Sequence, residues 1–309
     1  MKKSSDSLTW IRSKLEMMMS FRLFILFFLC TATLSYGKVY DCFPFFNEIE
    51  LLKMRLEELD SVVDHFVLVE SAETHKGNPK PLYFKENRAL FQKYLPKIIH
   101  VMLEERHPEW GAWQRENYQR ECISRGLFAC QPSDIVLVSD VDEIPRSTSV
   151  QRLKTDLLKE QSSKKHKHKK HKKKKAEKQP EIYALQMSIY FFHLNRQTPT
   201  KETWGGGQWV GTVATTYRTF IKYGAQQLRA QTLSYPRLRK AGWHFTWLGG
   251  KEKIRMKMAS VADNYDSQIT DEEIERWIRS HPIVPIDSTF PFYVQKNRDY
   301  LKSIGFIAE

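Results

Sequence analysis

Cysteine is scarce in this sequence. Four cysteines occur among 309 residues, and no two have Cys-x-x-Cys spacing, so the sequence does not predict a structural zinc site. Cys30 belongs to a hydrophobic N-terminal stretch, which leaves an odd number in the rest of the chain: Cys42, Cys122 and Cys130. A disulfide between Cys122 and Cys130 and three buried free thiols are both compatible with this pattern.

The sequence also lacks an uncharged run of the roughly 20 residues that a membrane-spanning helix needs. Its N-terminal hydrophobic stretch, residues 23–37, follows a basic segment, residues 1–22. Ser35 and Gly37 are small residues spaced as at a signal-peptide cleavage point. We therefore expect residues 23–37 to be a cleaved signal peptide or an uncleaved signal anchor. Either one sends residues 38–309 into a secretory lumen, or across the membrane of a bacterium.

Acidic residues are outnumbered in this chain. There are 36 Asp and Glu against 49 Lys and Arg, for a formal net charge of +13. Much of the excess lies in the N-terminal segment and in residues 164–175, which hold nine lysines and three histidines. Without these stretches the chain is nearly neutral, so its charge does not predict a nucleic-acid partner. We interpret residues 164–175 as a disordered insertion, rather than a nucleic-acid patch or a metal-binding tract, because so charged a run cannot bury a core.

The stretch Ser133–Pro145 is the most informative in the sequence. Its short apolar run, residues 135–138, is rich in β-branched residues and predicts a buried strand of an α/β sheet. Three acids follow directly, at the strand end where such sheets bind ligands: Asp140, Asp142 and Glu143. Three like charges need a counter-charge, which a divalent metal supplies, and the metal in turn binds a diphosphate. The alternative is a solvated acidic turn.

Strands and helices alternate around this stretch. Apolar runs predict strands at 39–43, 65–71, 97–103 and 182–194, and charged amphipathic segments predict helices at 47–59, 85–94, 110–128, 146–160 and 271–279. Asn47 and Glu50 form a capping-box-like pair at the start of the first helix, and Thr270 or Asp271 caps the last one. The β-α-β order implies parallel strands, which bring Glu70 to the same sheet edge as Asp140.

Two features of the C-terminal half leave alternatives open. His244 lies among aromatic residues within 241–250 and is either a satisfied core residue or a ligand. The glycine triplet 205–207 lacks the spacing of a phosphate-binding loop and is either a flexible turn or a loop on the acceptor side.

Together these stretches resemble glycosyltransferase family 17. The resemblance covers nearly all of residues 39–300, and the matching segments are 39–59, 64–71, 77–84, 139–145 and 241–247. It implies a GT-A-like α/β fold, a nucleotide-sugar-binding sheet flanked by helices, in a single globular domain over residues 38–309. It also implies inverting transfer of N-acetylglucosamine from UDP-N-acetylglucosamine to a mannose of an N-glycan core, on a glycoprotein or oligosaccharide acceptor. The expected location is the Golgi membrane with a lumenal catalytic domain, or a lumenal or secreted protein if the N-terminal segment is cleaved.

The resemblance further implies roles for individual residues. Asp140 and Asp142 would hold Mn²⁺ (or Mg²⁺) against the UDP diphosphate, and His244 would complete the metal shell. Contacts to the uridine, ribose and phosphates are expected from Asn47, Glu48, Glu70, Arg115 and Asp140. An inverting displacement also needs a base for the acceptor hydroxyl. The candidates are Glu143, Glu202 and Asp263, with a slight preference for Glu143 because its strand end lies near the donor.

Two other function classes match parts of the sequence. A haloacid-dehalogenase-type phosphatase also places Asp-x-Asp after an apolar strand. It needs Thr or Val where this chain has Ile144, and a later Gly-Asp-x-x-x-Asp motif that this sequence lacks. A non-catalytic sugar-binding relative would use the tryptophans Trp204, Trp209 and Trp243. The intact Asp140 and Asp142 argue against this second class.

Overall fold

The structure is a computed structural model that describes residues 37–165, 181–198, 207–265 and 268–309, with side chains left out at 160–165. Residues 37–309 form one compact unit. Several predictions lie outside the described residues and stay predictions. These are the N-terminal segments 1–22 and 23–36, most of the insertion at 164–175, two glycines of the triplet, and Glu202.

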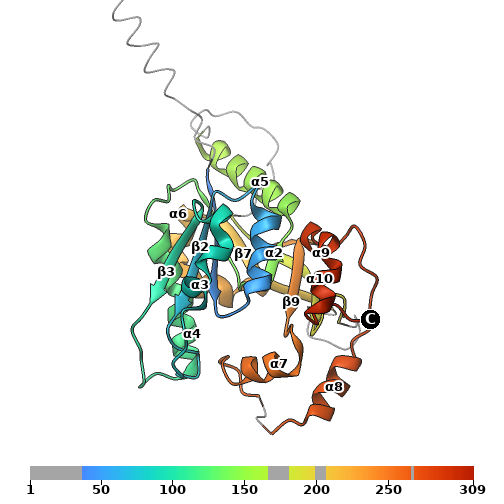
Figure 1. Ribbon diagram of the computed structural model, residues 1–309. Coiled ribbons are helices and arrows are strands. Elements are labelled where there is room, and N and C mark those ends of the chain that lie inside the picture. Colours follow the sequence, from blue (N-terminus) through green and yellow to red (C-terminus); the bar gives the residue numbers. More distant parts are fainter. Residues whose placement is uncertain (1–36, 166–180, 199–206, 266–267) are drawn as a thin grey trace, which may run out of the picture. The chain divides into compact units, whose positions relative to one another are not determined.

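A nine-stranded sheet forms the centre of the described part (Figure 1). Its order is β3-β2-β1-β4-β7-β6-β9-β5, and β8 pairs with β6. The first four strands in this order are parallel, and β7 joins β4 in antiparallel fashion. The strands are β1 (Val39–Phe45), β2 (His65–Ser71), β3 (Ile98–Leu103), β4 (Ile135–Val138), β5 (Glu143–Pro145), β6 (Ile182–Phe191), β7 (Gln208–Thr216), β8 (Arg237–Leu238) and β9 (Gly242–Thr246).

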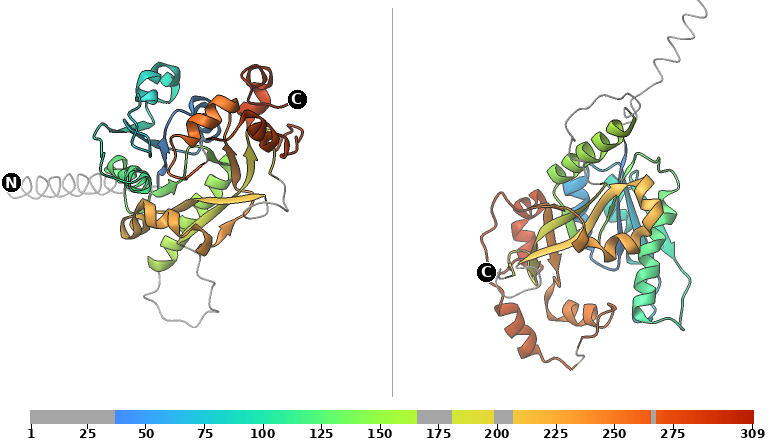
Figure 2. Two further views of the ribbon diagram at one scale, coloured as in Figure 1. Left: turned by 90° about the horizontal axis from the view of Figure 1, so that it is seen from below. Right: turned by 180° about the vertical axis from the view of Figure 1, so that it is seen from behind.

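Helices flank the sheet, as the views in Figures 1 and 2 show. The α-helices of the described ranges are α2 (Ile49–Leu59), α3 (Tyr83–Glu86), α4 (Ala112–Glu121), α5 (Ser147–Lys165), α6 (Tyr217–Ala230), α7 (Gly250–Met258), α8 (Asp271–Arg279), α9 (Phe292–Lys296) and α10 (Arg298–Ser303). Three 3₁₀ segments accompany them: η1 (Arg88–Tyr94), η2 (Cys122–Leu127) and η3 (Thr232–Ser234).

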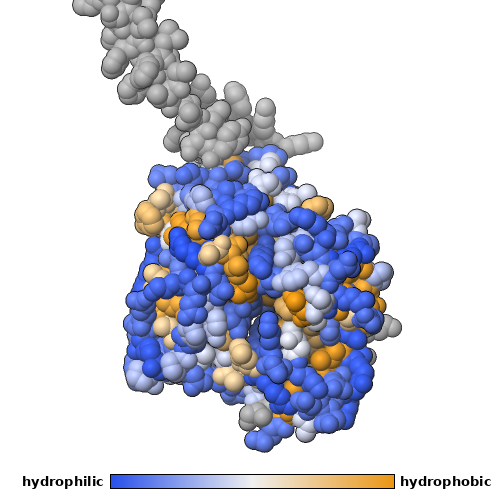
Figure 3. Space-filling view, viewed as in Figure 1, coloured by the Kyte–Doolittle hydropathy of each residue, from blue (hydrophilic) through white to orange (hydrophobic). Residues whose placement is uncertain are grey.

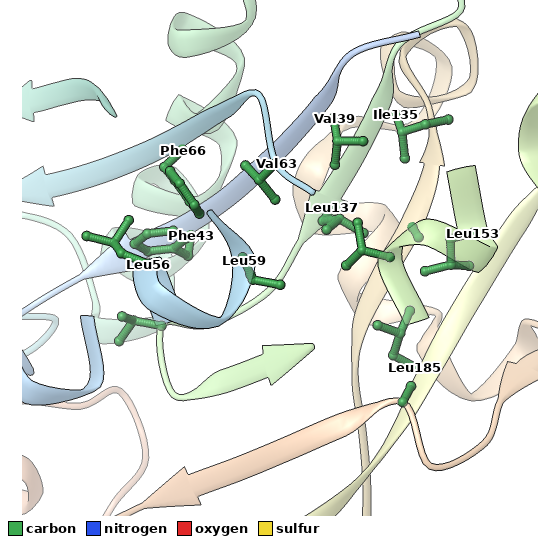
Figure 4. Close-up of a cluster of buried hydrophobic side chains, with 14 of the residues drawn as sticks. Val39, Phe43, Leu56, Leu59, Val63, Phe66, Ile135, Leu137, Leu153 and Leu185 are labelled. Carbon is green, nitrogen blue, oxygen red and sulfur yellow. The ribbon is translucent and has the colours of Figure 1, made fainter. Parts of the chain in front are cut away.

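The core lies on both faces of the sheet because side chains alternate along each strand. Val39 and Phe43 of β1 pack in one cluster with residues of α2 and α5, including Leu56 and Leu153 (Figure 4). The β1 residues between and beside them, such as Cys42, pack in a second cluster with η2 and α6. Helices therefore cover the parallel half of the sheet on both sides, and the strand ends remain to form a site.

The predicted fold class, an α/β sheet flanked by helices, is confirmed, as is the parallel β1–α2–β2 unit. Three details differ from the prediction. The predicted helix over 85–94 is mostly the 3₁₀ segment η1, which follows the short helix α3. Helix α2 begins at Ile49 after Glu48, with no side-chain capping bond, so the cap at Asn47 is wrong. The predicted helix over 110–128 begins at Ala112 and tightens into the 3₁₀ segment η2. At the last long helix, Thr270 and Glu273 form the capping box.

The three described cysteines, Cys42, Cys122 and Cys130, are free and buried, so Cys122 and Cys130 form no disulfide here. Among the residues that the structure describes, none of the helices has the length and hydropathy of a membrane span.

Candidate active site

A cavity of about 930 Å³ opens at the ends of the sheet strands. Its lining residues include ones from the carboxyl ends of β1 and β4, from the segment after β2, from β6, β7 and β9, and from α4, α6, α7 and α8. Figure 3 shows a largely hydrophilic face that is hollowed near its middle, with apolar side chains beside the hollow. Both Asp140 and Asp142 line the cavity, at the sheet edge where α/β proteins bind ligands.

Arg55 of α2 holds the turn that carries these acids. Its fully buried guanidinium donates to both carboxylate oxygens of Asp41, at 2.7 and 2.6 Å, and to Ser139 Oγ at 2.5 Å. It also donates to three backbone carbonyls of the turn, those of Asp140, Val141 and Glu143, at 3.0, 3.2 and 2.7 Å. A planar guanidinium with five donors can fix both a carboxylate and a backbone turn. The conformation of the acidic turn therefore depends on a residue about 85 positions earlier in the chain.

Asp140 lies between two arginines. Its Oδ1 accepts from Arg120 Nη2 at 3.1 Å and its Oδ2 from Arg229 Nη2 at 2.7 Å. Burial would raise the pKa of Asp140, but the guanidinium groups of Arg229 and Arg120 outweigh it and lower the pKa well below its ordinary value. Asp140 therefore remains ionised and orients the two arginines along the cavity wall.

Asp142 pairs with a lysine and a histidine. Its Oδ2 is 3.1 Å from Lys257 Nζ, and its Oδ1 is 3.4 Å from His244 Nε2. Lys257 also donates to Thr246 Oγ1 at 3.0 Å. Burial would raise the pKa of Asp142, but Lys257 and His244 outweigh it and lower the pKa well below its ordinary value. Asp142 is therefore a carboxylate at neutral pH, and His244, predicted from the sequence as a possible ligand, lies beside it.

Glu143 has internal partners for both carboxylate oxygens. Its side chain is fully buried. Oε1 accepts from Trp209 Nε1 at 2.5 Å and from Arg229, and Oε2 accepts from Thr212 Oγ1 at 2.9 Å and from the Asp140 amide at 3.3 Å. A base must be able to reach an acceptor hydroxyl, so this geometry points away from Glu143 as the base and gives it a part in holding Arg229 and Trp209.

A second set of titratable side chains lines the same cavity: His75, Glu116 and Asp263. His75 Nδ1 is 3.6 Å from Glu116 Oε2, and His75 Nε2 is 3.1 Å from Gln119 Oε1. Asp263 is exposed at the cavity rim. Burial and the negative charge of Glu116 raise the pKa of Asp263, while His75 opposes the shift. Of the two predicted bases that the structure describes, Glu143 and Asp263, Asp263 is therefore the one that combines access to the cavity with a raised pKa.

The residues predicted to contact the UDP-sugar divide into two groups. Glu48 and Asp140 line the cavity, whereas Asn47, Glu70 and Arg115 are not among the lining residues. Asn47 Nδ2 donates to Met256 Sδ at 3.1 Å. Glu70 is fully buried and accepts from the Phe84 amide at 2.8 Å, with His100 Nε2 at 3.0 Å. Arg115 is held by Glu73 and by backbone carbonyls such as that of His107. The structure therefore does not bring Asn47, Glu70 and Arg115 to the cavity lining, and their roles in binding the UDP-sugar stay predictions.

The cations of the site were not predicted from the sequence. Three acids at a strand end were expected to need a metal as counter-charge, but Arg120, Arg229 and Lys257 already provide one. These cations come from three different helices, and no local pattern in the sequence links them to the acids. The polar composition of the segment around Arg120 was the one available signal.

The side chains at the site are still suitable ligands for a divalent metal ion that also binds a substrate. Asp142 and His244 both line the cavity, and they supply a carboxylate and an imidazole, which are suitable ligands for Mn²⁺. In the described ranges, no group of three or more His, Cys, Asp or Glu is arranged to hold a metal. The metal would therefore need further ligands from phosphate oxygens and water, as is common for Mg²⁺ at phosphate sites.

Comparison with known proteins gives one family. The profile described as "Glycosyltransferase family 17" matches residues 30–260. The human protein named beta-1,4-mannosyl-glycoprotein 4-beta-N-acetylglucosaminyltransferase is 27% identical over 258 residues, covering 74% of this chain and 44% of its own length. The rat protein of the same name is 26% identical over 265 residues, covering 76% and 45%. The chain thus matches a little under half the length of these relatives.

Solved structures give weaker similarities. Glucosyl-3-phosphoglycerate synthase from Mycobacterium tuberculosis, in complex with Mn²⁺, UDP-glucose and glycerol 3-phosphate, is 13% identical with a TM-score of 0.35, covering 88% of this chain and 82% of that one. A mannosyltransferase from Pyrobaculum calidifontis, in complex with GDP-mannose and Mn²⁺, is 12% identical with a TM-score of 0.37, covering 88% and 72%. Likeness at this level assigns no site residues.

Proposed function

Because this chain belongs to glycosyltransferase family 17, we propose that it transfers N-acetylglucosamine from UDP-N-acetylglucosamine to a mannose of an N-glycan core, with inversion and with a divalent metal ion. The protein is a glycosyltransferase. The donor and acceptor proposed here follow the name of its curated relatives. The observation that carries the proposal is the pairing of Asp142 with His244 in a cavity that Arg120, Arg229 and Lys257 also line.

Asp142 and His244 would hold the metal ion, Mn²⁺ or Mg²⁺. The metal, when bound, offsets the negative charge that builds up on the leaving UDP. Arg229 and Lys257 line the same cavity and can donate hydrogen bonds to phosphate oxygens, so the charge on the leaving group is also offset by this chain's own cations. Asp140 keeps Arg120 and Arg229 in place for this purpose, through the two contacts described above.

Asp263 is the base that we propose for the acceptor hydroxyl. A carboxylate whose proton affinity is raised accepts a proton more readily than an ordinary surface aspartate. The raised pKa of Asp263 and its place at the cavity rim both support this choice over Glu143. Asp263 would take the proton while the hydroxyl oxygen attacks the anomeric carbon on the face opposite the departing UDP.

The proposed location follows from the sequence. If the stretch 23–37 is an uncleaved signal anchor, the protein is a Golgi membrane enzyme whose lumenal part acts on glycoproteins. If that stretch is cleaved, the enzyme is lumenal or secreted.

The test is the release of UDP from a panel of nucleotide sugars, with and without Mn²⁺, in the presence of an N-glycan core oligosaccharide. We expect turnover with UDP-N-acetylglucosamine that needs the metal. Asp142→Ala should lower turnover at least about 100-fold, on the scale of losing one electrostatic contact in a transition state. Asp299→Ala, which removes an exposed aspartate of α10, is the matched control.

The outcomes separate the alternatives. Turnover with another nucleotide sugar, or with another acceptor, would replace the donor or acceptor and keep the reaction class. Glycan binding without any turnover would identify a non-catalytic sugar-binding relative. Unchanged turnover in Asp142→Ala would refute the metal assignment.

A further inference from the structure

Four aromatic residues form one wall of the cavity, which we call the aromatic wall: Phe191, Trp247, Tyr265 and Trp277. The Trp247 and Tyr265 rings meet edge to face with centroids 4.8 Å apart, and the Trp247 and Trp277 centroids are 5.9 Å apart. These residues come from the end of β6, the residue after β9, the segment after α7, and α8. The members of the wall are spread over nearly ninety positions, so no local sequence pattern predicts it.

The aromatic wall adjoins the charged part of the site. Lys257 Nζ lies 5.5 Å from the centroid of the Trp247 ring and 3.1 Å from Asp142 Oδ2. The wall therefore begins beside the residues proposed to hold the metal and the diphosphate. A group seated against Trp247 is next to the place where the donor reacts.

The backbone is strained where the wall begins. Phe191 of β6 and Thr246 of β9 form the last pair of their two strands. The next residue on each strand is left-handed, with φ of +68° at Phe192 and +62° at Trp247. Bulky residues rarely adopt this region, and such strain tends to occur at functional sites. Here the left-handed conformation makes β6 and β9 turn at the same level of the sheet. Phe192 then packs against Trp277, with ring centroids 4.8 Å apart, and Trp247 lines the cavity.

The wall runs from the interior of the cavity toward solvent. Trp247 is 7% exposed, whereas Tyr265 and Trp277 are partly exposed. Asp263, the proposed base, lies two residues before Tyr265 and also lines the cavity. A donor sugar that is tethered to a diphosphate needs an enclosed position. An acceptor oligosaccharide must enter from solvent and place a hydroxyl beside the base.

We infer that the aromatic wall is the acceptor subsite, where a pyranose of an oligosaccharide lies with its C–H face against Trp277 and Trp247. A pyranose ring combines an apolar C–H face with hydroxyls at its edge, and flat aromatic side chains bury such a face at low entropic cost. The hydroxyls at the ring edge remain free to meet Asp263. This inference rests on the proposed function, since it requires a reaction with a sugar acceptor.

The test compares KM values in the full-length protein, with UDP-N-acetylglucosamine as donor and an N-glycan core oligosaccharide as acceptor. Trp277→Ala should raise the acceptor KM at least about tenfold, on the scale of truncating a tryptophan anchor at an interface, and change the donor KM much less. Trp277→Phe, which keeps an aromatic face, should recover most of the loss. Tyr265→Ala provides a second variant at a partly exposed position in case Trp277→Ala does not fold.

The matched control is Phe292→Ala. Phe292 is a 63% exposed aromatic of α9 and is not among the lining residues. An unchanged acceptor KM in Trp277→Ala and Tyr265→Ala, or a donor KM that rises as much as the acceptor KM, would overturn the inference. If the wild-type protein releases no UDP, the proposed function fails. Titration of the oligosaccharide against the wild-type and Trp277→Ala proteins then tests separately whether the aromatic wall binds a sugar. Weaker binding in the variant supports the subsite, and equal binding or none in the wild type overturns it.

Discussion

Replacing Arg55 tests whether the acidic turn is held from the protein interior. Both side chains of the Arg55–Asp41 ion pair are fully buried. Removing one partner of a buried pair leaves the other charge without compensation, which costs about 3–5 kcal/mol. Arg55→Met also removes the hydrogen bonds that Arg55 donates to three carbonyls of the turn. We therefore expect the free energy of unfolding to fall by at least about 3 kcal/mol.

The expected changes can be measured by urea and thermal unfolding. For a chain of this size, a loss of this magnitude lowers Tm by roughly 10 °C. Arg55→Lys should also destabilise the protein, since a lysine keeps the charge but cannot bind the carboxylate and the turn together. Arg152→Met is the matched control, because that arginine of α5 is 68% exposed and forms an ion pair with Asp156 on the same helix. This control should change stability by less than about 1 kcal/mol.

A double variant distinguishes the buried pair from a general packing defect. Arg55→Met combined with Asp41→Leu removes both charges, so its loss of stability should be smaller than the sum of the two single losses by about 1–3 kcal/mol. UDP release should fall in Arg55→Met even under conditions where the protein is folded, because the turn positions Asp142. Strictly additive losses, or full activity in Arg55→Met, would refute the reasoning.

Two further predictions concern the packing around Gly211 and the pH dependence of the reaction. A Cβ at Gly211 would overlap Arg229, Glu143 and Trp209, so Gly211→Ala should cost about 1–3 kcal/mol of stability and lower UDP release. Gly111→Ala, where the nearest atom would be 3.5 Å away, should do neither. If Asp263 is the base, kcat/KM falls as pH drops through its pKa, because the protonated acid cannot accept a proton. That acid limb lies above the ordinary aspartate pKa of 3.8, since burial and Glu116 raise the pKa of Asp263. Asp263→Asn should abolish the limb, and Glu116→Gln should move it to lower pH. A limb that persists in Asp263→Asn would show that another group is the base.

Local patterns predicted the framework of this fold well. The apolar run at 135–138 became β4, and the β-α-β order gave the parallel pair of β1 and β2. These features depend on periodicity and chain order, which a sequence displays directly. Helix ends were less reliable, as at Asn47, because capping depends on the conformation of one or two residues.

Site residues were predictable only in part. Asp140, Asp142 and His244 do lie together at the cavity, because the turn after β4 leads into β5, which pairs Glu143 with His244 of β9. Glu70 also follows the strand-end rule, but its side chain is buried against the Phe84 amide and His100. The strand-end rule places a backbone position and does not fix the direction of a side chain or the identity of its neighbours.

The sequence by itself determined the α/β class, the position of the acidic turn and the family, since each is carried by contiguous residues. Only the tertiary structure decided which charges meet. Arg229 pairs with Asp140 across 89 positions, and Lys257 pairs with Asp142 across 115. Such contacts arise from the packing of helices onto a sheet. Packing depends on the whole core at once, so no single segment of the sequence encodes the neutralised acids or the aromatic wall beside them.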